Sequence, residues 1–140
     1  MGKKQNTLFL NKYMELDKVC CDKFGVNTGS GVIEYINRLS NARYAPGRDE
    51  VLSRLIAYSN THKRFHYEPG AMRNDSQITQ DDIKWVAKFK RQVTKKKDPI
   101  SRYLKKARSY AFKKKLVRIL WASLIIAFIA AVIALIIVLV

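Results

Sequence analysis

The sequence predicts an all-α protein. We expect a small cytoplasmic bundle of about four helices, then a basic juxtamembrane helix that runs into one C-terminal transmembrane helix. Three observations predict this order: apolar residues recur every three or four positions in residues 1–97, Lys and Arg crowd residues 84–118, and residues 119–140 contain no charge. The predicted domains are therefore a helical domain over 1–97, a juxtamembrane helix over 98–118 and a span over 119–140.

The composition averages two unlike pieces. The 140 residues carry a net charge of +16, yet residues 1–83 hold 12 basic and 10 acidic side chains, which is close to neutral. The abundance of Leu, Ile, Val and Phe excludes a disordered polycation. The only cysteines, Cys20 and Cys21, are adjacent, which excludes a disulfide-stapled scaffold.

Two amphipathic helices are predicted first. Gly25 is expected to end the first helix as its C-terminal cap. Ser30 is expected to cap a second helix with its side chain, before a break at residues 45–47. The apolar stripe of the first helix comprises Phe9, Tyr13, Leu16, Cys20 and Phe24, and that of the second comprises Val32, Ile36 and Leu39.

Two further helices follow in the same domain. The third is expected to begin near residues 48–50 and to break at residues 68–70, and residues 73–78 are expected to form a loop. Thr79 and Asp82 have the spacing of a capping box, with Asp in place of Glu or Gln. The stripe of this fourth helix comprises Ile83, Val86, Phe89 and Val93.

The last helix is expected to begin at Asp98 and Pro99, which suit the N-cap and first helical positions, and to run unbroken to the end. Residues 119–140 would extend about 33 Å as a helix, against a hydrocarbon core of about 30 Å. The basic flank before them predicts a single-pass, tail-anchored protein with residues 1–118 in the cytoplasm, and we expect a bacterial inner membrane. Trp121 is the expected anchor at the membrane interface.

The basic residues before the span are expected to contact anionic lipid headgroups. Nucleic acid is the alternative partner, because Lys-rich stripes also neutralise phosphates. Within the span, small residues spaced by four favour close approach of a second span, and therefore a homo-oligomer. The expected headgroup contacts are Arg102, Lys105, Lys106, Arg108, Lys113, Lys114, Lys115 and Arg118, and the expected self-association residues are Ser123, Ala127 and Ala131.

Few residues suggest chemistry. His62 and His66 are four apart, so they share a helix face and are the natural pair for a metal or for acid–base cleavage of RNA. Two ligands do not make a metal site, and the sequence has no phosphate-binding loop and no nucleophile elbow. We therefore predict no metal, no cofactor and no enzyme, with Cys20 and Cys21 as apolar filler.

Residues 58–72 resemble the end of the third helix in prokaryotic HEPN-type helical domains. Many members of that superfamily are metal-independent ribonucleases of toxin–antitoxin or phage-defence systems, with an Arg four to six residues before a His. The resemblance implies a nuclease site at His62, Arg64, His66 and Tyr67. The pattern departs from the family because no Arg precedes either histidine at that spacing. When this sequence is aligned with the family motif at the helix break over residues 68–70, His62 stands in place of the Arg and Tyr67 in place of the His.

The sequence thus favours a membrane-anchored head that binds a protein partner or oligomerises. The two alternatives are a membrane-tethered HEPN-like ribonuclease or RNA-binding protein, and a binder of anionic lipid headgroups.

Overall fold

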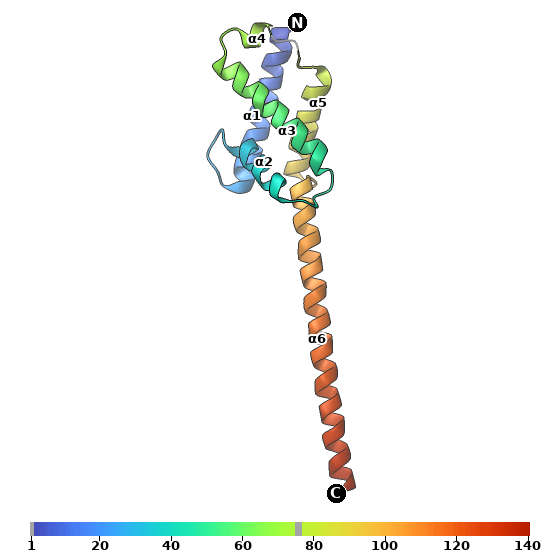
Figure 1. Cartoon of the computed structure of the whole chain (residues 1–140). Helices are drawn as coiled ribbons and strands as arrows, with labels where there is room; N and C mark the ends of the chain where they lie inside the picture. The colour runs from blue at the N-terminus through green and yellow to red at the C-terminus, as the bar shows by residue number, and fades with distance from the viewer. Residues whose placement is uncertain (1, 75–76) are drawn as a thin grey trace. The chain divides into compact units, whose positions relative to one another are not determined.

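The structure, a computed structural model, describes residues 2–74 and 77–140, and their regular structure is entirely helical (Figure 1). The chain forms two compact units, Met1–Tyr103 and Leu104–Val140, and we call the first unit the head. The predicted all-α fold is confirmed. The helices are α1 (Gly2–Phe24), α2 (Gly31–Asn41), α3 (Arg48–Tyr67), α4 (Ala71–Asn74), α5 (Gln80–Thr94) and α6 (Pro99–Leu139).

Helix α1 is the centre of the head, and α2, α3, α4 and α5 all contact it (Figure 1). Its predicted stripe is buried as expected, apart from Phe24, which is half-buried. The stripes of α2, α3 and α5 meet it to form one core. The buried side chains of those helices include Val32, Tyr35 and Leu39 from α2, Leu55, Tyr58 and Phe65 from α3, and Ile83, Val86, Phe89 and Val93 from α5.

Aromatic rings bridge the helices of the core. The Phe9 ring meets the Tyr58 ring edge-on at 5.5 Å between centroids and the Phe65 ring at 6.3 Å. On the other side of the core, Tyr35 of α2 meets Phe89 of α5 edge-on at 5.3 Å. Each such pair contributes about 0.5–1.5 kcal/mol beyond its buried area, so these rings fix how the helices pack.

Most helix ends match the sequence analysis. Gly25 ends α1 with a φ of 66°, and its N–H donates to the Cys21 carbonyl at 2.8 Å. The capping box of α5 is confirmed: Thr79 Oγ1 accepts from the Asp82 N–H, and Asp82 Oδ2 accepts from the Thr79 N–H. These bonds satisfy backbone groups that a helix end otherwise leaves without partners.

The expected capping of α2 by the Ser30 side chain is wrong. Ser30 occupies the N-cap position, but its side chain makes no capping bond. The buried carboxylate of Asp17 on α1 takes that role, with Oδ1 accepting from the Val32 N–H at 3.0 Å and Oδ2 from the Gly29 N–H at 2.8 Å. Gly31 permits this close approach, because an added Cβ would meet the Asp17 carbonyl and lie 2.8 Å from Cys21 Sγ.

Two other local features differ from expectation. The predicted loop over 73–78 is wrong at its start, because α4 is helical from Ala71 to Asn74, and residues 75–76 lie outside the described residues. The Asn6 side chain holds α4 on α1, since its Nδ2 donates to the Met72 carbonyl at 2.8 Å. Between α5 and α6, Lys96 has a φ of 56°, a left-handed conformation normally reserved for glycine.

Candidate functional site

The first turn of α6 is fastened to the core of the head by a buried polar cluster around Asp98. Asp98 is fully buried, and its Oδ2 accepts a 2.6 Å hydrogen bond from the Tyr35 hydroxyl of α2. Its Oδ1 accepts another 2.6 Å bond from the Ser101 hydroxyl one turn on. The predicted N-cap role of Asp98 is confirmed, because its side chain also accepts from the Ser101 N–H.

Lys23, at the end of α1, completes this cluster. Its Nζ donates to Ser101 Oγ at 2.7 Å and lies 3.9 Å from Asp98 Oδ1. Burial raises the pKa of the Tyr35 hydroxyl well above its ordinary value, and the neighbouring Asp98 carboxylate raises it further. The hydroxyl therefore stays protonated as a donor. Since α1, α2 and the start of α6 all contribute, the cluster holds the first turn of α6 within the head.

Helix α6 is one unbroken helix from Pro99 to Leu139, as predicted. Among the described residues, the chain has one helix long and apolar enough to cross a membrane, and none of its apolar window is buried in the protein. The predicted transmembrane segment, residues 119–140, falls in this part of the chain. A core helix of a soluble protein would bury such a surface.

The predicted headgroup contacts all lie on α6 and are exposed, from Arg102 to Arg118. Trp121, the predicted interface anchor, is 64% exposed. In the self-association stripe, Ser123 Oγ donates to the Ile119 carbonyl at 3.0 Å, so its hydroxyl is satisfied within its own helix. What the three predicted residues share at the helix surface is therefore their small size.

The histidine pair lies at the edge of the core. The half-buried His62 ring stacks on Tyr13 of α1 at 4.6 Å between centroids, and the exposed His66 ring is 6.3 Å from His62. Burial lowers the pKa of His62, and the nearby His66 lowers it further. No group of three or more His, Cys, Asp or Glu side chains suitable for a metal occurs in the described part of the chain.

The residues that carry the HEPN resemblance do not form one site. Tyr67 is 77% exposed, His66 is exposed beside it, and Arg64 is half-buried on another side of the helix. His66 and Tyr67 line a surface pocket of about 410 Å³ with Lys3 and other residues, and neither His62 nor Arg64 lines it. Between Arg64 and His66 in sequence, Phe65 is buried in the core.

Both thiols are buried. Burial raises the pKa of Cys20 to about 12, and it also raises the pKa of Cys21, which lies 3.6 Å from Asp17 Oδ2. A thiol reacts as its thiolate, so these cysteines are held in the unreactive form. Their position is that of the apolar filler we predicted.

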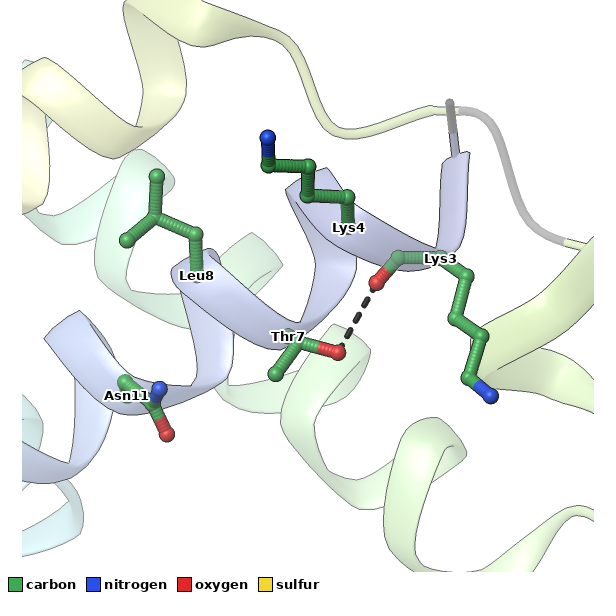
Figure 2. A pocket seen from close by; sticks show the side chains of 5 residues that line it. All are labelled: Lys3, Lys4, Thr7, Leu8 and Asn11. Atoms are coloured by element: carbon green, nitrogen blue, oxygen red, sulfur yellow. Dashed lines mark hydrogen bonds between the residues drawn. The ribbon is translucent and has the colours of Figure 1, made fainter.

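Figure 2 shows one surface pocket of the head. It has a volume of about 580 Å³ and is lined by residues of α1 alone. The side chains of Lys3 and Lys4 point away from one another, and Thr7 Oγ1 donates to the Lys3 carbonyl at 2.8 Å. Because the cations diverge and the hydroxyl is already bonded, the pocket gathers no set of groups that act together.

Local sequence patterns did not predict the partners of Asp17 or the Asp98 cluster. Each depends on residues far apart in the chain, and Tyr35 and Asp98 are 63 positions apart. Asp98 was recognised only for its local capping role. The available signal was Tyr35 beside the apolar stripe of α2, because a tyrosine hydroxyl needs a partner once it is buried.

The fold and these features define an all-helical protein with one helix suited to cross a membrane. The chain belongs to a family of unknown function (DUF6548), which matches residues 7–119. The match covers the head from residue 7 onward and the basic segment, up to the first residue of the predicted span. No curated protein and no solved structure matches the chain.

Proposed function

We propose that the chain is a tail-anchored, single-pass membrane protein whose helical head is a protein-interaction or oligomerisation module on the cytoplasmic side. The observation that carries the proposal is the arrangement of α6, where a basic stretch precedes an apolar stretch exposed on every side. Exposed Ile, Leu and Phe are unfavourable in water and favourable in lipid. The basic stretch supports the orientation through the positive-inside rule.

A topology experiment tests this proposal on the full chain in cells. A reporter that is active only in the cytoplasm should work when fused before Met1 and fail when fused after Val140. The reverse pattern would contradict the charge argument. Activity of both fusions would show that the apolar segment does not cross the membrane.

Self-association through the span is the second part of the proposal. At about 100° per residue, Ser123 and the four alanines from Ala127 to Ala134 share one face of α6, and the rest of the span bears larger side chains except Ala122. Small residues let two helices approach closely, so van der Waals packing can hold the spans together. A head attached to such a span is brought beside a second head.

The chain offers a matched control for this idea. Ala127→Ile with Ala131→Ile should reduce dimers trapped by chemical crosslinking in membranes, because two added side chains separate the helices. Ala122→Ile adds one such side chain about 120° around the helix from this face and should leave crosslinking unchanged. If the unmodified chain and both variants crosslink equally, the span is not part of the interface.

A ribonuclease is the second candidate, favoured by one observation. His66 and Tyr67 line a pocket together with Lys3 and Arg73, two cations suited to phosphate. If this is an active site, His66→Ala should lower RNA cleavage by about 100-fold or more, the usual contribution of a general acid or base. Our proposal expects no cleavage of single-stranded RNA by the purified full chain.

A lipid-headgroup function is the third candidate. The eight basic side chains from Arg102 to Arg118 are all exposed, and each contributes about 1 kcal/mol near an anionic leaflet. In a chain truncated after Arg118, Lys113, Lys114 and Lys115 changed to Gln should weaken retention on anionic vesicles and leave retention on neutral vesicles unchanged. Salt-dependent binding of RNA in place of vesicles would favour the nucleic-acid alternative.

A further inference from the structure

A second pocket of the head differs from the hollow of Figure 2, because three separate segments build it. It has a volume of about 230 Å³ and lies where the start of α3, one face of α5 and the first turn of α6 meet. Three basic residues line it: Lys88 of α5, Lys97 of the turn between α5 and α6, and Arg102 of α6. All of these residues belong to the head.

The positive charge in this pocket is not neutralised by the protein. Within the described part of the chain, Lys88, Lys97 and Arg102 form no ion pair, in contrast to Lys90, which pairs with Glu15 at 3.0 Å. One acid, Glu50, lines the pocket, and Arg54 lies 3.7 Å from its carboxylate. Three cations that line one pocket without ion-pair partners repel one another, and an anion bound in the pocket would relieve that repulsion.

The framework of the pocket is fixed in advance. The Asp98 cluster holds the first turn of α6 in the core, and the Arg102 N–H donates to the Asp98 carbonyl at 3.0 Å. The left-handed Lys96 makes the tight turn that precedes Lys97, whose N–H donates to the Gln92 carbonyl at 2.8 Å. A site whose backbone is already placed loses less entropy on binding.

We propose that this pocket, which we call the junction pocket, binds a phosphate monoester. Drug-sized ligands occupy pockets of about 300–1,000 Å³, so 230 Å³ suits one small group. A phosphate monoester carries a charge of about −1.5 to −2 at pH 7, which matches three cations and one acid better than a carboxylate does. The group could come from a lipid headgroup or from solution, and both share this chemistry.

The experiment titrates inorganic phosphate against the full chain in neutral phosphatidylcholine nanodiscs and follows binding by phosphorus NMR. Lys88→Gln, Lys97→Gln and Arg102→Gln should each weaken binding about tenfold. The triple change Lys18→Gln, Lys84→Gln and Lys95→Gln removes three charges, more than any one pocket variant, from exposed positions outside the pocket and should preserve binding. The same titration in detergent micelles makes the result independent of whether α6 crosses a bilayer.

A gain of affinity provides the second check. Glu50→Gln removes the one acid of the pocket and should tighten phosphate binding by about threefold. Equal weakening by the pocket variants and the control variant would overturn the proposal in favour of general surface charge. Failure of the unmodified chain to bind phosphate would overturn it as well.

Changing the lipid composition of the nanodisc distinguishes a lipid headgroup from a phosphate in solution. If the pocket takes a lipid headgroup, discs with a phosphoinositide that carries one phosphate monoester should block inorganic phosphate. Discs with phosphatidylserine of equal charge should not block it, since that lipid has no phosphate monoester. Equal phosphate binding in both kinds of disc would assign the pocket to a phosphate from solution.

Discussion

Helices α5 and α6 are both rich in Lys and Arg, yet they separate charge from apolar surface in different directions. In α5 the separation runs around the axis, so Ile83, Val86, Phe89 and Val93 are buried while Lys84 and Lys88 face water. In α6 it runs along the axis, with basic residues before the apolar segment. The first arrangement produces a core helix, and the second requires two different surroundings.

Deleting residues 119–140 should have the largest effect, because it removes the part of α6 that requires surroundings different from those of α5. The truncated chain should move from the membrane pellet to the soluble fraction, because the exposed apolar part of α6 is removed while the core of the head is untouched. Fractionation and immunoblotting measure this. Changing Lys113, Lys114 and Lys115 to Gln is the control and should leave the full chain in the pellet. A truncated chain that stays in the pellet and resists salt would contradict the anchor.

The junction between the two helices can be broken at Asp98. Asp98→Ala should destabilise the head by about 3–5 kcal/mol, because it leaves the buried Tyr35 hydroxyl and the Lys23 ammonium without their shared partner. Denaturant unfolding of the full chain in detergent, followed by near-ultraviolet circular dichroism, measures the change.

Tyr35→Phe is the matched comparison for that change. It removes one hydroxyl and leaves Asp98 bonded to Ser101, so it should cost about 1–3 kcal/mol. If Asp98→Ala costs no more than Tyr35→Phe, the carboxylate is not what fastens α6 to the head.

Much of this fold is predictable from local sequence. The stripes of α1, α2 and α5, the Gly25 cap and the Thr79 capping box depend on residues within a few positions of one another, and each was predicted correctly. The Asp17 cap was not, because its Val32 partner lies 15 positions away on another helix. Sequence patterns report local geometry, and they do not report which faces meet.

The histidine pair and the junction pocket show the same limit of prediction from local sequence. The spacing of His62 and His66 placed them on one face, but only the packing of α1 shows that Tyr13 covers His62. Lys88, Lys97 and Arg102 belong to one basic stretch of sequence, and the turn at Lys96 lets all three line one pocket.

The two candidate caps of α2 can be separated by substitution. Asp17→Ala should destabilise the head by about 2–3 kcal/mol, because it removes a buried acceptor shared by the Gly29 and Val32 N–H groups. Ser30→Ala should change stability by less than about 0.5 kcal/mol, since the Ser30 side chain makes no capping bond. Denaturant unfolding compares both variants with the unmodified chain, and the reverse ranking would restore Ser30 as the cap.

The turn between α5 and α6 should become more stable when its left-handed residue is replaced. Lys96→Gly should stabilise the head by about 1 kcal/mol, because glycine adopts a positive φ without the steric cost that a Cβ brings. For a domain of this size, that gain raises the melting temperature by about 4–8 °C. Lys95→Gly is the control: Lys95 has a φ of −85°, so it should gain nothing.

The smallest expected effect is a dependence on pH at the edge of the core. Burial lowers the pKa of His62 in the folded protein, so above about pH 6.5 the ring is neutral in both the folded and unfolded states. As the pH falls below that value, the unfolded chain takes up the proton more readily, and the head loses stability. The melting temperature should therefore drop between pH 7.5 and pH 5.5.

His62→Phe should make that drop smaller, because it keeps a ring against Tyr13 and removes the titrating group. His66→Gln should reduce it only in part, since it removes the second cause of the lowered His62 pKa and leaves burial, the larger one. An unchanged drop in His62→Phe would assign the pH dependence to another group of the head. A drop lost equally in both variants would show that the charge on His66, and not the burial of His62, sets the response.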